Sequence, residues 1–162
     1  MRSRICITSA ITAGAMLTIM TTAAVAATHP AMGSWELNLA KSTEESTDAP
    51  PKSVNFTFAD TAKGVTLTTK NVAADGKQTV TKGAPIKWDG MAHPDTGESD
   101  HDSITVKPVG AQTVEWAFTK KGAPVRSGTL AVSRDGKMMT VSGFFVTAKG
   151  EKTYFNDIFD RK

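Results

Sequence analysis

Residues 113–146 read TVEWAFTKKGAPVRSGTLAVSRDGKMMTVSGFFV, and the pattern within them decides the fold. In residues 113–118 every second side chain is large and apolar, and residues 129–132 repeat this alternation. A period of two predicts β-strands with one buried and one solvated face. Lys121-Gly122 and Asp135-Gly136 separate the apolar runs, and glycine supplies the positive φ that tight hairpin turns need. The stretch therefore predicts three consecutive antiparallel strands joined by short turns.

The same alternation recurs through the chain from residue 33 onward, and no segment there has a helical period. Gly83 and Pro85 interrupt residues 78–89, so one broken strand is an alternative to two strands there. The predicted strands span 33–39, 53–59, 64–72, 78–82, 85–89, 102–108, 112–119, 125–133, 138–147 and 152–160. Many short strands with tight turns are typical of a sandwich or an up-and-down barrel. Because the hairpins are sequential, we predict one all-β domain, an antiparallel up-and-down barrel or a strongly curved meander of about 8–10 short strands.

The first 27 residues have the order of features that marks an exported protein. Two arginines precede an apolar stretch over residues 5–20, and small residues dominate residues 21–28. This order predicts a cleavable secretory signal over residues 1–27, cut after Ala26 or Ala27. The apolar stretch is short and rich in Thr and Ala, whereas a transmembrane anchor needs about 20 apolar residues. We therefore expect a periplasmic or secreted protein that is not membrane-spanning, with a single domain over residues 28–162.

Cysteine usage and charge exclude several classes of function. Cys6, the only cysteine, lies inside the predicted signal, so the domain has no thiol for a disulfide or a thiolate metal site. The signal holds two of the 19 basic residues and no acidic one, which leaves 17 basic against 16 acidic residues. These charges are interspersed, whereas a nucleic-acid-binding protein needs a basic stripe. We expect no nucleic-acid partner.

Residues 90–102, GMAHPDTGESDHD, form the most polar and acidic stretch. Its candidate metal ligands are His93, Asp95 and His101, but their spacing matches no established metal-binding template. A solvated loop whose Asp and Ser residues cap turns explains the same composition. We therefore predict no metal site and no cofactor, with the imidazoles of His93 and His101 pointing apart. Four carboxylates of the stretch should be exposed, namely Asp95, Glu98, Asp100 and Asp102.

Catalysis needs a nucleophile, a base and an orienting group in one place, and no motif of the chain supplies this set. His29 lies near the N-terminus that the predicted cleavage would create, and we expect it to be disordered. We predict that the protein is not an enzyme. An enzyme with an unrecognised carboxylate or metal site is an alternative, because catalytic carboxylates must be close in space rather than in sequence.

The aromatic residues of the predicted strands either fill the core or line a ligand cavity, and eight-stranded barrels do both. We adopt the hypothesis of an exported module that binds a small apolar molecule in the mouth of the barrel. The cavity-facing residues would then be Trp35, Phe56, Phe58, Trp88, Trp116 and Phe118. The alternative is an envelope structural, interaction or stress protein with a filled core.

Residues 33–42, GSWELNLAKS, resemble the start of a group of exported bacterial proteins with no established activity. These proteins share a Gly-x-Trp-x-Leu-Asn-x-x-Lys-Ser pattern at their beginning. The later elements of that group are matched by Pro50-Pro51, Trp88-Asp89-Gly90, Ser133-Arg134-Asp135-Gly136-Lys137 and the aromatic segment over residues 154–159. The resemblance spans nearly the whole predicted domain.

Gly33-x-Trp35 on the first predicted strand also resembles the lipocalin signature. This resemblance implies a lipocalin-like barrel in which Trp35 closes one end and the late basic residue Arg161 packs over it. The chain lacks the C-terminal helix, the Thr-Asp-Tyr element and the disulfide of lipocalins.

Overall fold

The computed structural model describes residues 28–45, 49–95 and 100–162, so the predicted signal over residues 1–27 and Glu98 lie outside the described residues. Within these ranges the chain forms eleven β-strands and no helix, which confirms the all-β prediction. The strands are β1 (Gly33–Leu37), β2 (Thr43–Glu44), β3 (Ser53–Thr61), β4 (Gly64–Val72), β5 (Gln78–Lys82), β6 (Ala92–Pro94), β7 (Ser103–Pro108), β8 (Thr113–Lys120), β9 (Ala123–Val132), β10 (Met138–Val146) and β11 (Lys152–Arg161).

All strands belong to one antiparallel sheet, in the order β5-β4-β3-β1-β11-β10-β9-β8-β7-β6, with β2 beside β11. β1 connects the two parts of the sheet, because it pairs with β3 on one side and with the last strand, β11, on the other. β5 and β6 form the two edges of the described sheet. The sheet is therefore a strongly curled half-barrel. We predicted either a barrel or a strongly curved meander, and the structure agrees with the meander.

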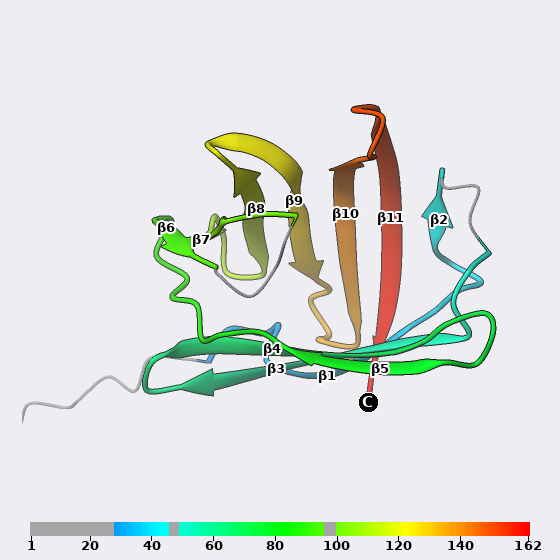
Figure 1. Ribbon diagram of the computed structural model, residues 1–162. Helices are drawn as coiled ribbons and strands as arrows, with labels where there is room; N and C mark the ends of the chain where they lie inside the picture. The colour runs from blue at the N-terminus through cyan, green and yellow to red at the C-terminus, as the bar shows by residue number, and fades with distance from the viewer. Residues whose placement is uncertain (1–27, 46–48, 96–99) are drawn as a thin grey trace, which may run out of the picture.

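The curl brings the two parts of the sheet into contact (Figure 1). β1, β3, β4 and β5 run across the base, while β8, β9, β10 and β11 stand upright above them (Figure 1). Each part turns its apolar face inward, as a sheet with one buried and one solvated face requires. The core lies where these two faces meet.

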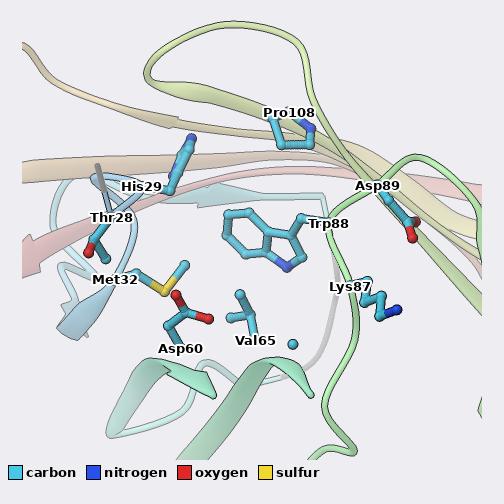
Figure 2. A pocket seen from close by; sticks show the side chains of 10 residues that line it. Thr28, His29, Met32, Asp60, Val65, Lys87, Trp88, Asp89 and Pro108 are labelled. Carbon is cyan, nitrogen blue, oxygen red and sulfur yellow. The ribbon is translucent and has the colours of Figure 1, made fainter. Parts of the chain in front are cut away.

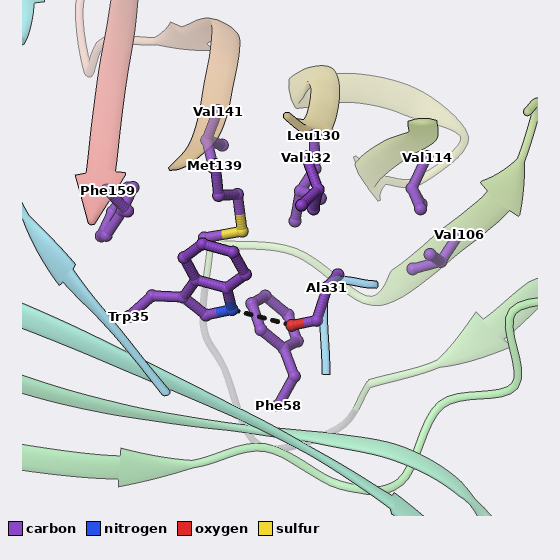
Figure 3. Close-up of a cluster of buried hydrophobic side chains, with 10 residues drawn as sticks. All are labelled: Ala31, Trp35, Phe58, Val106, Val114, Leu130, Val132, Met139, Val141 and Phe159. Atoms are coloured by element: carbon purple, nitrogen blue, oxygen red, sulfur yellow. Dashed lines mark hydrogen bonds between the residues drawn. The ribbon is translucent and has the colours of Figure 1, made fainter. Parts of the chain in front are cut away.

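Trp35 is the centre of this core. Trp35, Met139 and Phe159 are at most 1% exposed, and they come from β1, β10 and β11. Figure 3 shows the Trp35 indole between the base and the upright strands, where its Nε1–H donates to the Ala31 carbonyl oxygen over 2.8 Å. The rest of the buried core comes from the N-terminal segment, β3, β7 and the upright strands, namely Ala31, Phe58, Val106, Val114, Leu130, Val132 and Val141.

One row of cross-strand neighbours explains the curl of the upright strands. Trp116, Gly128, Gly143 and Phe155 face one another in register across β8, β9, β10 and β11. Neighbouring strands lie about 4.8 Å apart, yet the Trp116 and Phe155 ring centroids, three strands apart, are separated by 6.3 Å. A Cβ on Gly128 would press into the carbonyl oxygen of Ser142. The bare glycines therefore let the sheet bend until the two rings stack.

The structure differs from the predicted strands in three places. Residues 85–89 form no strand, and Ile86 makes only an isolated bridge to Val65. Pro85 has no N–H to donate to a ladder, which explains why the pairing does not extend. The short strand β2 lies between the predicted strands 33–39 and 53–59, and β6 lies within residues 90–102, which we expected to be a loop. Two or three residues are too few to show a period.

Candidate functional site

Arg161 closes one end of the half-barrel and fixes the N-terminal segment there. Its guanidinium carbon lies 4.1 Å from the centroid of the Trp35 ring, an arrangement that adds a cation–π attraction. The same guanidinium donates to the carbonyl oxygens of Pro30, Met32 and Gly136. These bonds hold residues 30–32 against the end of the sheet, so the segment forms a rigid wall.

The six aromatic candidates occupy three different environments. Trp35 and Phe58 are buried in the core, and Phe56 stacks on Phe159 with ring centroids 4.6 Å apart. Trp116 and Phe118 are half-buried neighbours on β8, with ring centroids 5.7 Å apart. Of the six, Trp88 alone lines the pocket described next. The structure therefore distributes these rings rather than gathering them around one cavity.

A pocket of about 390 Å³ opens to solvent beside Trp88 (Figure 2). Met32 of the N-terminal segment, Val65 of β4 and Pro108 at the end of β7 supply further apolar walls around the indole (Figure 2). The remaining lining residues are Thr28, His29, Asp60, Gly64, Lys87 and Asp89. The base of the pocket is thus apolar, with charged side chains around it.

His29 is an ordered part of this wall, so our expectation of disorder was wrong. Its ring meets the Trp88 ring edge to face at 5.2 Å, and its Nδ1 accepts the backbone N–H of Ala31. Burial lowers the pKa of His29 below its ordinary value. The ring is therefore neutral at pH 7, with Nδ1 as acceptor and the proton on Nε2. The buried Nε2 has no hydrogen-bond partner among the described residues.

The charged side chains near the pocket are Asp60, Lys87 and Asp89. Asp89 Oδ1 lies 2.8 Å from His93 Nε2, and this hydrogen bond holds the pKa of Asp89 below its ordinary value. Asp60, on β3, lies on the same face as Phe58, because alternate residues of a strand share a face. Asp89 is thus engaged by a neighbouring imidazole, whereas Asp60 and Lys87 remain exposed at the rim.

The two histidines of the acidic stretch bind different carboxylates. His93 engages Asp89, whereas His101 lies between Asp95 and Asp100, with Nε2 to Asp95 at 3.1 Å and Nδ1 to Asp100 at 2.8 Å. Both nitrogens of His101 donate only when the ring is protonated. The part of the chain that the structure describes contains no group of three or more His, Cys, Asp or Glu residues arranged to hold a metal ion.

His101 also changes the exposure of its neighbours. The imidazole is only 7% exposed and packs edge to face on Phe118 at 4.7 Å. Asp95, which is bound to this buried imidazole, is only 16% exposed, so our expectation of an exposed Asp95 was wrong. Asp100 is 56% exposed, as expected. Burial acts to raise the pKa of Asp100, but the hydrogen bond and charge of His101 outweigh it and lower this pKa.

Several pocket residues escaped the sequence reasoning. Met32 and Val65 carry no motif, and His29 was set aside because it lies near a chain end. Trp88 was named as a cavity-facing candidate, whereas Asp89 was noted only as part of a family pattern. What these residues share is a position close to Trp88, and this position depends on how β4, β7 and the N-terminal segment come together. Sequence spacing does not reveal such contacts.

The described ranges contain no helix long and apolar enough to cross a membrane. No family model matches the chain, and no curated protein or solved structure matches it either.

Proposed function

We propose that the chain is an exported, non-enzymatic module that binds a small apolar molecule in the pocket beside Trp88. The observation that carries this proposal is the pocket itself: about 390 Å³, within the range of roughly 300–1,000 Å³ that is usual for small-molecule sites. Its walls combine an indole, a flexible thioether and a β-branched side chain, from Trp88, Met32 and Val65. Such surfaces favour apolar ligands through the loss of hydrated area.

The walls of the pocket also suggest the shape of the ligand. Arg161 holds residues 30–32 by donating to the carbonyl oxygens of Pro30 and Met32, so the wall that contains Met32 is preformed. A preformed wall avoids part of the entropy loss that binding otherwise entails. The pocket is open to solvent, so a bound molecule stays partly exposed and affinity is limited. We expect a small, flat, apolar ligand that stacks on Trp88 with micromolar affinity.

Titration of the exported protein with N-phenyl-1-naphthylamine, a neutral apolar fluorophore, tests this proposal. We expect saturable fluorescence enhancement that is lost in Trp88→Ala and kept in Trp116→Ala, which removes a half-buried indole elsewhere. Circular dichroism establishes that both variants are folded. Equal binding by the wild type and by folded Trp88→Ala would contradict the proposal.

Export is tested separately by the intact mass of the protein recovered from the periplasm or medium. We expect the mass of a chain that begins at Ala27 or Thr28, because the small-residue site ends there. Recovery of the full-length precursor in the membrane fraction would contradict export and cleavage.

A second candidate function is that of an envelope interaction protein, and one feature of the outer surface favours it. Phe144 and Tyr154 form a cross-strand aromatic pair on β10 and β11, with ring centroids 6.1 Å apart. Tyr154 is 52% exposed, and the Lys152 ammonium lies 4.2 Å from the Phe144 ring centroid. A photo-crosslinking residue at position 154 should then capture one defined partner in intact cells. The same residue at the exposed position 80 serves as the control.

A further inference from the structure

Asp157 lies on the concave face of β11, among side chains that form the core. Phe155, Asp157 and Phe159 are every second residue of β11, so their side chains share one face. The cross-strand partner of Asp157 is Val141 of β10. Val141 and Phe159 belong to the buried core, and Phe155 packs against it. Directly paired residues share one face of the sheet. The Asp157 carboxylate therefore projects toward the inside of the half-barrel, where it is half-buried.

Two stacked aromatic pairs flank this carboxylate. On one side Phe155 stacks on Trp116 of β8, with centroids 6.3 Å apart and planes at 26°. On the other side Phe159 stacks on Phe56 of β3, with centroids 4.6 Å apart and planes at 23°. The two pairs are held from opposite parts of the sheet, since β8 is upright and β3 lies in the base (Figure 1). Because Phe155 and Phe159 lie two positions to either side of Asp157 and share its face, the two stacked pairs flank its carboxylate along β11.

Asp157 has no partner of opposite charge in the part of the chain that the structure describes. None of the described residues forms a hydrogen bond or an ion pair with its carboxylate, although most buried polar groups in proteins are paired. Burial, and then the negative charge of Glu44 on β2, raise its pKa to about 6. At pH 7 the group is therefore mostly ionised, in a setting that disfavours its charge.

The other charged groups of this face do not neutralise Asp157. Arg126 lies 3.6 Å from Asp100, and Arg161 donates to backbone carbonyls at the closed end. Strand register and alternation place the following titratable side chains on the concave face: Glu44, Asp60, His93, Lys120, Arg126, Asp157 and Arg161. Of these, Glu44 alone acts on the charge of Asp157, and it adds negative potential. Among the described residues, no positive charge therefore compensates the Asp157 carboxylate.

We propose that the concave face binds a small organic monocation, with Asp157 as its counter-ion and the rings of Trp116, Phe155 and Phe56 as its apolar walls. An organic ammonium is attracted both by a carboxylate and by aromatic rings. A metal ion instead needs several ligands held together, and no such group exists in the described ranges. The site shares no residue with the pocket beside Trp88, so it is independent of the proposed apolar site.

Isothermal titration calorimetry with benzyltrimethylammonium tests this site on the exported protein at pH 7.5. We expect saturable 1:1 binding that weakens about tenfold or more in Asp157→Asn, which keeps the shape and removes the charge. Trp116→Leu should also weaken binding, because it removes one ring of the flanking pair. The matched control is Glu115→Gln, an exposed carboxylate on the other face of β8, which should bind like the wild type.

The pH dependence and a neutral analogue provide two further checks. Because the pKa of Asp157 is about 6, binding at pH 5 should be roughly tenfold weaker than at pH 7.5, where the carboxylate is ionised. Benzyl alcohol has a similar ring without the charge, and it should not compete. Trp88→Ala should leave cation binding intact, which separates this site from the apolar pocket. No saturable binding, equal affinity in folded Asp157→Asn, or equal competition by benzyl alcohol would overturn the proposal.

Discussion

Truncation of Trp35 tests the core and the closed end of the half-barrel together. The indole is fully buried, its Nε1–H donates to Ala31, and the Arg161 guanidinium lies over its ring. Replacing a buried tryptophan by alanine costs about 3–5 kcal/mol through lost burial and the cavity that remains. The hydrogen bond contributes about 1 kcal/mol, and the cation–π contact about 0.5–1 kcal/mol. We therefore expect Trp35→Ala to lose about 5 kcal/mol, out of a total stability of roughly 5–15 kcal/mol for a domain.

Urea unfolding, followed by far-ultraviolet circular dichroism, measures this loss. With a slope of about 2 kcal/mol per molar urea, the midpoint of Trp35→Ala should fall by about 2 M or more, or the variant should not fold. Trp35→Phe keeps a ring beneath Arg161 but loses the donor to Ala31, so its midpoint should lie between those of the wild type and Trp35→Ala. A Trp35→Ala midpoint within about 0.3 M of the wild type would refute the position of Trp35 at the centre of the core.

Three further predictions follow from other parts of the structure. The native pKa of Asp157 is about 6, above its unfolded value, so its contribution to stability is present at pH 4 and lost as pH rises through 6. Because Asp157 is partly exposed, its effect is reduced, and Asp157→Asn should stabilise the domain by about 1 kcal/mol at pH 8 and by nothing measurable at pH 4. An equal effect at both pH values in urea unfolding would contradict this prediction. Gly128→Ala should destabilise the domain by about 1–3 kcal/mol or more, because its methyl group would meet the backbone of β10. The methyl group of Gly110→Ala would make only an ordinary contact of 3.9 Å with Thr113 Cβ, so this variant should be near neutral. Equal midpoints of the two variants in thermal unfolding would oppose this account of the curl. Calorimetric titration with zinc should show no submicromolar stoichiometric site, because His93 and His101 engage different carboxylates. Tight zinc binding that is abolished when both histidines are replaced by alanine would contradict this prediction.

Local patterns in the sequence were sufficient for most strands and for the class of fold. The alternation in residues 53–59, 112–119 and 138–147 predicted β3, β8 and β10, because the side chains of a strand alternate between a buried and a solvated face. The resemblance of Gly33-x-Trp35 to the lipocalin signature implied a buried tryptophan with Arg161 above it, and both features are present. The alternation depends on residue type and on short spacing, which a sequence displays directly, whereas the place of Arg161 came from the resemblance alone.

The tertiary structure alone decided the register and the contacts that create the candidate sites. Gly128 and Gly143 are fifteen positions apart, and only the pairing of β9 with β10 shows that they are neighbours beneath Trp116 and Phe155. His29 is ordered because the wall beside it is held by Arg161, which lies near the opposite end of the chain. The Asp157 carboxylate faces inward because β11 lies between β1 and β10, and the sequence around residue 157 does not reveal this position. Each of these facts rests on contacts between segments distant in sequence, and such contacts depend on the free energy of the whole folded chain rather than on any local pattern.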